Sequence, residues 1–233
     1  MANLTGLDRS RYVQTMFARI AHRYDRMNRL MTIGQDVRWR QEVIQRSELP
    51  PNGYLLDLGA GTGDLAREAL HQHPHSHAVA ADFTLEMMRM GKRRPGTAHL
   101  VWSAADALQL PFPSDTFDAV VSGFLLRNVI DLRSALQEQH RLLKPGGRVV
   151  SLDTTRPPAN FLSPAINFHL HVVIPALGRL VAGEGEAYKY LPDSTETFLG
   201  AEQLASRMIA TGFRQVGFRR VMFGTIAIHW GVK

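Results

Sequence analysis

The chain has 233 residues, of which 45% are hydrophobic and 21% charged, and it contains no cysteine. This length fits one α/β domain with a sizeable core, and the lack of cysteine excludes disulfides and thiolate metal sites. The formal net charge of +6 favours anionic surroundings, either nucleic acid or an anionic lipid surface. No uncharged run approaches the roughly 18 residues that a membrane span needs, so we expect a cytoplasmic protein without a spanning segment.

The first fifty residues predict a pair of helices. Apolar residues recur at helical spacing from Val13 to Met31, and Gly34 interrupts the pattern. A second helix is expected over residues 37–49, before Pro50. The simpler interpretation is a helix pair that covers a sheet edge. The sharper one is a lid over a ligand site, because ligands of such sheets bind at the carboxyl ends of the strands.

A glycine-rich loop follows at Tyr54–Gly63, where a short apolar run leads into glycines spaced G-x-G-x-G. The pattern predicts a strand, a tight loop and a helix, and glycines there leave room for a ligand against the backbone. A dinucleotide fingerprint has the spacing G-x-G-x-x-G instead. The carboxylates of Asp57 and Asp64 beside the loop would repel a pyrophosphate and suit a cationic ligand with an amino group.

Two further carboxylates are expected at strand ends. Residues 77–81 predict a second strand that ends at Asp82, and a carboxylate about 20 residues past such a loop is placed to accept both hydroxyls of a ribose. The alternative is that Asp82 caps the helix that follows. Residues 99–103 predict a third strand. After it, Asp106 could accept a hydrogen bond from the exocyclic amine of adenine, with the backbone of Ala107 beside it.

The middle of the chain repeats the strand–helix alternation. Residues 117–124 form an almost continuous apolar run, which suits a strand buried on both faces of a parallel sheet. A helix over 132–143 is expected to end at Lys144–Gly147, and residues 148–153 give a fifth strand. This alternation predicts a doubly wound parallel sheet.

The last part of the chain differs. The apolar stretch 160–183 is interrupted by prolines and predicts a helical insertion that forms one wall of a pocket. A role in the core alone is equally compatible with it. Tyr188 and Tyr190 follow this stretch and are expected to line the pocket. A helix over 201–211 and strands over 215–221 and 225–230 close the chain. We therefore expect a single domain of four parts: an N-terminal helical lid (1–50), a ligand-binding core (51–155), a substrate-side insertion (156–198) and a C-terminal helix with a hairpin (199–233).

The glycine loop resembles the first motif of class I S-adenosylmethionine-dependent methyltransferases, acidic-x-G-x-G-x-G. From about Phe17 to the end, the chain is similar to the ubiquinone/menaquinone biosynthesis C-methyltransferases. The motifs that carry this resemblance are Phe17–Asn28, Trp39–Arg40, Leu56–Asp64, Leu110–Pro113, Leu126–Val129, Tyr188–Leu191 and Ile226–His229. The resemblance implies a Rossmann-like class I methyltransferase fold, α/β, with a seven-stranded mostly parallel sheet and an antiparallel last strand.

The chain also departs from that family. The family usually has a second glycine where Ala60 stands, His-Arg where Asp36–Val37 stand, and Ser-Phe-Gly where Gly123–Leu125 stand. The last change removes a serine hydroxyl from the cofactor edge and adds bulk beside the expected pocket. It therefore bears on the identity of the quinone more than on the chemistry.

The resemblance implies methyl transfer from S-adenosylmethionine to a ring carbon of a prenylated quinol, with demethylmenaquinol favoured over another lipid or small phenolic acceptor. It places the cofactor at Asp57, Gly59, Gly61, Thr62, Asp82, Phe83, Asp106 and Ala107. A cation near the quinol oxygen would stabilise the phenolate. Arg127 is our candidate for that cation, and Asn128 would orient the oxygen. The candidates for the base are Tyr24, Asp25, Asp153, His169 and His171.

The partners expected from the same reasoning are the prenylated quinol and an anionic membrane surface. The basic N-terminal helices and the apolar insertion would touch the inner face of the plasma membrane. Nucleic acid is not expected, because the basic residues are not interleaved with aromatic residues along one stripe. No metal site is expected either, and a homodimer is compatible with the sequence.

Overall fold

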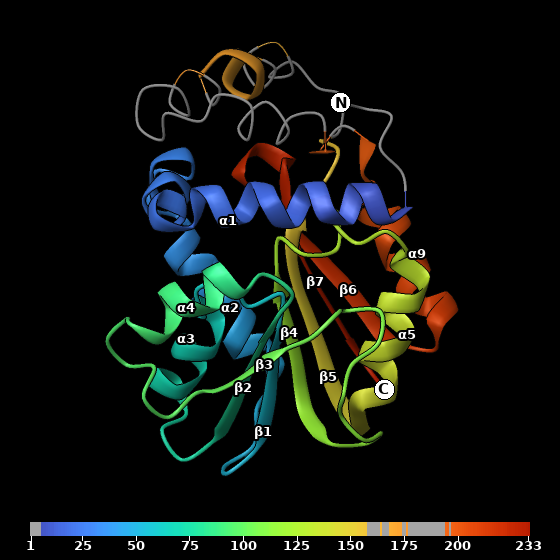
Figure 1. Cartoon of the computed structure of the whole chain (residues 1–233). Helices are drawn as coiled ribbons and strands as arrows, with labels where there is room; N and C mark the ends of the chain where they lie inside the picture. Colours follow the sequence, from blue (N-terminus) through green and yellow to red (C-terminus); the bar gives the residue numbers. More distant parts are fainter. Residues whose placement is uncertain (1–5, 158–163, 165–167, 174–175, 177–193, 196) are drawn as a thin grey trace.

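The computed structural model describes residues 6–157, 164, 168–173, 176, 194–195 and 197–233. Its centre is a seven-stranded sheet with the strand order β3-β2-β1-β4-β5-β7-β6 (Figure 1). The strands are β1 (Tyr54–Leu58), β2 (His77–Asp82), β3 (Val101–Ala104), β4 (Phe117–Gly123), β5 (Leu143–Thr154), β6 (Arg214–Val221) and β7 (Ile226–Val232). The first five strands are parallel, and β7 runs antiparallel to both of its neighbours. The predicted fold class is confirmed.

Helices cover both faces of this sheet. The described helices are α1 (Gly6–Met31), α2 (Asp36–Ser47), α3 (Asp64–Gln72), α4 (Leu85–Lys92), α5 (Leu132–Leu142) and α9 (Ala201–Thr211), with the short helices η1 (His169–Val173) and η3 (Met222–Gly224). Apolar side chains of α2 and α3 pack on one face, and those of α5 and α9 pack on the other. Neighbouring residues of β1 alternate between these two cores, with Leu55 in one and Leu56 in the other, as the two-residue period of a strand requires.

Helix α1 lies across the carboxyl ends of the strands (Figure 1). Its buried stripe, which includes Met16, Ile20 and Met27, recurs at helical spacing. Two side chains fasten it to the loops below. Arg9 Nη2 donates to the Arg127 carbonyl at 2.8 Å, and Gln14 Nε2 donates to the Phe83 carbonyl at 2.9 Å. The helix therefore covers the edge at which a ligand of this sheet would bind.

Some predicted boundaries were wrong. The third strand begins at Val101 rather than at residue 99, because a turn precedes it in which the Leu100 amide donates to the Thr97 carbonyl. The fifth strand begins at Leu143 rather than at residue 148, because Leu143 pairs with Phe117 ahead of a register shift. Most of the expected insertion 156–198, including Tyr188 and Tyr190, lies outside the described residues.

Candidate active site

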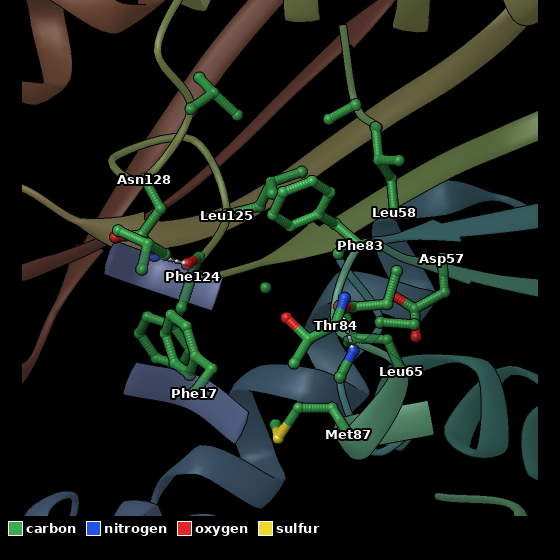
Figure 2. A pocket seen from close by; sticks show the side chains of 18 of the residues that line it. Phe17, Asp57, Leu58, Leu65, Phe83, Thr84, Met87, Phe124, Leu125 and Asn128 are labelled. Atoms are coloured by element: carbon green, nitrogen blue, oxygen red, sulfur yellow. Dashed lines mark hydrogen bonds between the residues drawn. The ribbon is translucent and has the colours of Figure 1, made fainter. Parts of the chain in front are cut away.

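A pocket lies at the carboxyl edge of the sheet, under α1 (Figure 2). Its wall is built by the loops that follow β1, β2, β3 and β4 and by side chains of α1 and α2. The sequence-predicted site residues on this wall are Tyr24, Asp57, Gly59, Gly61, Thr62, Asp82, Phe83, Asp106, Ala107 and Asn128. Arg127 is the predicted site residue that is not among the lining residues. The fold thus gathers candidates from four separate loops at one edge.

The glycine loop forms the floor of the pocket. Gly59, Gly61 and Gly63 have φ values of 68°, 57° and 82°, a backbone region that side chains with a Cβ rarely adopt. The amides of Gly59 and Ala60 both donate to the Ala81 carbonyl, which ties the loop to β2. A Cβ on Gly59 would lie 2.8 Å from Leu125 Cδ1. The loop therefore requires glycine both for its conformation and for the space beside Leu125.

Asp82 is held rigidly at the tip of β2. Its Oδ2 accepts from the Gly61 amide at 2.7 Å, and its Oδ1 accepts from the Thr84 amide at 2.6 Å. Burial raises the pKa of its carboxyl, and these hydrogen bonds oppose that shift. The residue that caps α4 is Thr84, so the alternative in which Asp82 is the helix cap was wrong. Each carboxylate oxygen has a further lone pair with which it can accept a ligand hydroxyl.

Asp106 and Ala107 stand at the tip of β3. Asp106 Oδ1 accepts from the Leu108 amide at 2.9 Å, which fixes the carboxylate in a local turn. Asp106 is exposed, whereas Ala107 is buried. Along the sheet edge, β3 is the neighbour of β2. The two strand tips therefore present fixed acceptors side by side.

Asp57 is buried at the end of β1, and its Oδ2 accepts from the Ala66 amide of α3 at 2.9 Å. Burial raises the pKa of this carboxyl from its ordinary value of 3.8 to about 7, against the opposing effect of the Ala66 hydrogen bond. The carboxylates of Asp64 and Asp82 add to the rise. A cationic ligand beside Asp57 would restore its negative charge.

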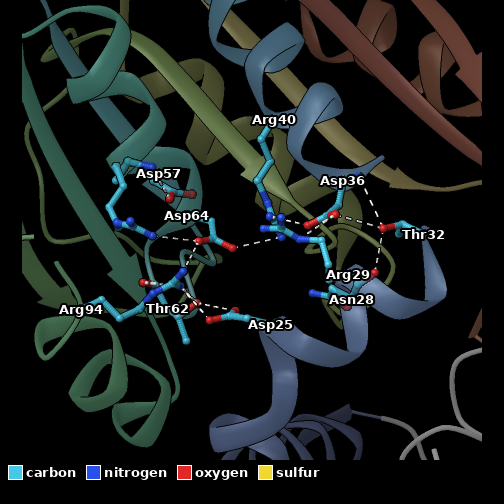
Figure 3. Close-up of polar contacts among 12 residues, drawn as sticks. Asp25, Asn28, Arg29, Thr32, Asp36, Arg40, Asp57, Thr62, Asp64 and Arg94 are labelled. Atoms are coloured by element: carbon cyan, nitrogen blue, oxygen red, sulfur yellow. Dashed lines mark hydrogen bonds and ion pairs between the residues drawn. The ribbon is translucent and has the colours of Figure 1, made fainter. Parts of the chain in front are cut away.

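Asp64 has a different role from the one expected. Its Oδ1 lies 2.8 Å from Arg94 Nη2, and its Oδ2 lies 3.0 Å from Arg40 Nη2 (Figure 3). Arg67 is a third partner at 3.4 Å. These arginines offset the charge of Asp64, so of the two acidic residues beside the loop only Asp57 remains our candidate for attracting a cationic ligand.

The same arginines fasten the helices to the glycine loop (Figure 3). Arg94 Nη1 lies 2.8 Å from Asp25 Oδ2 and donates to the Thr62 hydroxyl at 2.7 Å. That hydroxyl donates to Asp25 Oδ1 at 2.9 Å. Arg40 Nη1 bonds Asp36 Oδ2 at 2.6 Å. Sequence reasoning missed the contacts of Arg40 with Asp64 and of Arg94 with Asp25, because ion pairs between distant segments leave no periodic signal. The pair of Arg40 with Asp36 lies within α2, four residues apart, and that spacing could have indicated it.

Arg127 is buried, with 5% of its surface exposed, and its Nη1 lies 2.7 Å from Asp153 Oδ1. Its amide donates to Asp153 Oδ2 at 3.2 Å, and its guanidinium carbon lies 5.2 Å from the ring centre of Phe124. Phe124 lines the pocket, whereas neither Arg127 nor Asp153 does. The negative charge of Asp153 offsets the unfavourable burial of this arginine. The pair lies behind the residues that line the pocket.

Of the candidate bases whose side chains are described, Tyr24 alone lines the pocket. Burial raises the pKa of its phenol, opposed by Asn28 and by the positive charges of Arg127 and Arg40. Its ring packs edge to face on Phe17 with ring centres 5.7 Å apart. Asp25 is engaged by Arg94, and His171 is exposed on η1; the side chain of His169 lies outside the described residues. Tyr24 is therefore a neutral phenol at the pocket wall.

Asn128 also lines the pocket, at the end of the loop that follows β4. Its Nδ2 donates to the Phe124 carbonyl at 2.9 Å, which fixes the side chain against this loop (Figure 2). Phe124 has a φ of 59°, a left-handed conformation that is costly for an aromatic residue. Leu125, one of the family departures, fills the space beside Gly59. The loop is thus held in one shape by Asp153 on one side and by Asn128 on the other.

Solved structures with the same fold include methyltransferases and a cyclase. The [4+2]-cyclase SpnF superposes with a TM-score of 0.69 at 17% identity, covering 95% of this chain and 94% of that chain. A SAM-dependent methyltransferase from Aquifex aeolicus superposes with a TM-score of 0.59 at 16% identity, covering 83% of this chain and 88% of that one. At these identities the likeness establishes the fold alone.

Sequence comparison is more specific. The Desulfotalea psychrophila ubiquinone/menaquinone biosynthesis C-methyltransferase UbiE is 46% identical over 221 residues, which are 95% of this chain and 90% of that protein. The demethylmenaquinone methyltransferase of Thermus thermophilus is 40% identical over 218 residues, which are 93% of this chain and 99% of that protein. The ubiE/COQ5 methyltransferase family pattern matches residues 5–233. The chain therefore belongs to the ubiE/COQ5 methyltransferase family.

Proposed function

We propose that this protein transfers a methyl group from S-adenosylmethionine to a ring carbon of a prenylated quinol in quinone biosynthesis, with demethylmenaquinol as the favoured acceptor. The observation that carries the proposal is the pocket under α1, in which fixed carboxylates at the tips of β2 and β3 stand beside a glycine loop. The names of the relatives, UbiE and demethylmenaquinone methyltransferase, support the choice of acceptor.

The residues of the pocket fit S-adenosylmethionine. Gly59 lines the pocket in a left-handed conformation packed closely beside Leu125, Asp82 can accept from the ribose hydroxyls, and Asp106 with Ala107 can hold the adenine. Asp57 lies where the cationic amino-acid end would reach. When bound, the cofactor supplies an activated sulfonium methyl for an in-line displacement.

The chain's own residues must align the acceptor and raise the electron density of its ring. A neutral Tyr24 can donate a hydrogen bond to the quinol oxygen as negative charge develops on it, whereas its raised pKa disfavours the phenolate that a general base needs. Asn128, in the loop after β4, can hold the same oxygen. Arg127 acts from behind that wall, where it holds Phe124 and the loop in place.

Tyr24→Phe keeps the ring packed on Phe17 and removes the hydroxyl. We expect the rate of methyl transfer to fall about 100-fold, the typical cost of losing one hydrogen bond to a developing oxyanion. The assay uses labelled S-adenosylmethionine with reduced demethylmenaquinol or a reduced ubiquinol precursor as acceptor. Tyr54→Phe, at the exposed start of β1, is the matched control. If Tyr24→Phe transferred methyl as fast as that control, the Tyr24 hydroxyl would have no role in the reaction. If the unaltered protein methylated neither quinol, the acceptor would be another phenolic or lipid molecule.

Gly59→Ala tests the cofactor cradle. The added Cβ would lie 2.8 Å from Leu125, so we expect the affinity for S-adenosylhomocysteine, measured by calorimetry, to fall more than about tenfold, in addition to a strain of about 1–2 kcal/mol at a left-handed residue. Gly146→Ala is the matched control, because Gly146 has a φ of 81° and open space around it. Equal affinities in the two variants would show that the cradle at Gly59 does not touch the cofactor.

We also propose that α1 brings the protein to the inner face of the plasma membrane, where a prenylated substrate would reside. Among the described residues, no helix is both long and apolar enough to cross a bilayer. Arg11, Arg19 and Arg26 are exposed on α1, and Ile33, in the turn after it, has 78% of its surface exposed. A basic surface with an exposed apolar side chain suits anionic lipid.

Ile33→Asp is expected to reduce sedimentation with vesicles that contain anionic lipid several-fold, because it removes an apolar anchor and adds a negative charge. Binding of the unaltered protein should weaken as salt is raised. Ile209→Asp, on α9, replaces an exposed apolar residue elsewhere and should have little effect. If the unaltered protein failed to bind anionic vesicles at low salt, the proposed membrane contact would be wrong.

A further inference from the structure

We propose that Arg40 of α2 binds the carboxylate at the amino-acid end of S-adenosylmethionine. This inference rests on the proposed use of that cofactor, and it assigns a residue to the ligand's carboxylate, for which the sequence analysis names no partner. Among the described residues that line the pocket, Arg40 is the only cation. Its side chain is 13% exposed, so the guanidinium is largely withdrawn from water, where a contact with an anion is strongest.

The order of the strands places the amino-acid end at Arg40. With adenine at Asp106, just after β3, and ribose at Asp82, at the end of β2, the rest of the ligand would extend along the edge toward β1, since the order is β3-β2-β1-β4. The lining residues at the end of β1 include Asp57 and Gly59, and Arg40 faces the pocket from α2 above them. A carboxyl group that leaves the ribose in this direction would approach the part of the pocket that Arg40 lines.

Arg40 is held ready for such a contact. Its Nη1 bonds Asp36 Oδ2 at 2.6 Å and its Nη2 lies 3.0 Å from Asp64 Oδ2, and Asp36 is almost fully buried (Figure 3). The guanidinium has more N–H donors than these two contacts use. Because both partners hold the planar group in one orientation, little side-chain entropy remains to be lost when a ligand binds.

The charge of the surrounding cluster also leaves room for an anion. The ion pairs that connect to Arg40 join four arginines to three aspartates, namely Arg29, Arg40, Arg67 and Arg94 with Asp25, Asp36 and Asp64. The cluster therefore has one positive charge in excess. Asp57, on the same part of the wall, offers a carboxyl to the ligand's amino group. A positive cluster beside an acidic residue matches the two opposite charges of an α-amino acid.

The test compares two ligands by calorimetry without any quinol: S-adenosylhomocysteine and its decarboxylated analogue, which lacks only the carboxylate. We expect the unaltered protein to prefer S-adenosylhomocysteine about ten- to a hundredfold, the usual value of a hydrogen bond to a charged group. Arg40→Gln should abolish this preference by lowering the affinity for S-adenosylhomocysteine while leaving the affinity for the decarboxylated analogue unchanged. Arg46→Gln is the matched control, because Arg46 also lies on α2 and pairs with an acidic residue four positions earlier, Glu42, but is outside this cluster and does not line the pocket; it should keep the preference.

An unaltered protein that binds both ligands equally well would overturn the inference, whether or not the variants fold. If Arg40→Gln lowered the affinity for both ligands equally, the inference would also be overturned, and the role of Arg40 would be limited to its ion pairs with Asp36 and Asp64. If the unaltered protein bound neither ligand, the proposed cofactor itself would be wrong, so the two failures are distinguishable. The melting temperature of each variant, measured without ligand, reports the loss of the ion pairs separately.

Discussion

Replacing Asp153 with asparagine is expected to lower the free energy of unfolding by about 3–5 kcal/mol, because it leaves a buried arginine without its counter-charge. Arg127 and Asp153 are almost fully buried, and the ion pair between them measures 2.7 Å. The Nε atom of Arg127 has no hydrogen-bond partner among the described residues, so the guanidinium relies on this carboxylate. Urea unfolding followed by circular dichroism measures the loss.

The double variant Arg127→Met/Asp153→Asn should recover most of that stability, since two apolar or neutral side chains of similar size need no counter-charge. It should nevertheless remain slow in methyl transfer, because the loop of Phe124 and Asn128 has lost its anchor. Glu86→Gln breaks the exposed Arg89 pair and should cost less than about 1 kcal/mol. If Asp153→Asn proved no more costly than this surface control, the pair would not be the anchor described above.

Asp57 is expected to make the empty protein less stable as the pH rises. Burial raises its pKa from 3.8 to about 7, so the folded protein holds a proton that the unfolded chain releases between these values. The contribution of Asp57 to stability is therefore fully present below about pH 4 and is lost as the pH rises through about 7. A shift of this size corresponds to about 4 kcal/mol.

The measurement is the difference in unfolding free energy between the unaltered protein and Asp57→Asn at several pH values. The unfolding free energy of the unaltered protein should fall relative to that of Asp57→Asn between about pH 4 and about pH 8. Asp131→Asn is the control. Hydrogen bonds from Ser134 lower the pKa of Asp131 below its ordinary value of 3.8, so this residue is ionised in the folded and the unfolded chain over most of this range and its difference should stay nearly constant. A difference that does not vary with pH would mean that Asp57 is ionised in the empty protein as in water.

Much of the pocket could be predicted because the residues that form it belong to short sequence motifs. The glycine loop and the carboxylates after successive strands, Asp57, Asp82 and Asp106, are each recognisable within a few residues, and a parallel sheet brings all such strand ends to one edge. The periodicity of α1 and the apolar run of β4 likewise predict the elements that carry Tyr24 and Asn128.

The rest depends on contacts between segments that are distant in the sequence. Nothing near Arg127 indicates that Asp153 is its partner, because that contact depends on the alignment of β4 with β5. The same limit applies to Arg40, whose place on the pocket wall follows from the packing of α2. His229 belongs to the C-terminal family motif but is buried in β7, where its Nε2 lies 2.9 Å from the Ala201 carbonyl. It contributes to packing rather than to the pocket.

We expect this protein to place the methyl group on a carbon of a quinol ring. The most direct measurement is to incubate the protein with S-adenosylmethionine that carries an isotopically labelled methyl group and with reduced demethylmenaquinol, and to locate the label in the product by NMR. We predict a labelled methyl group on a ring carbon. Label on a hydroxyl oxygen, or no transfer by protein that binds S-adenosylhomocysteine, would contradict it.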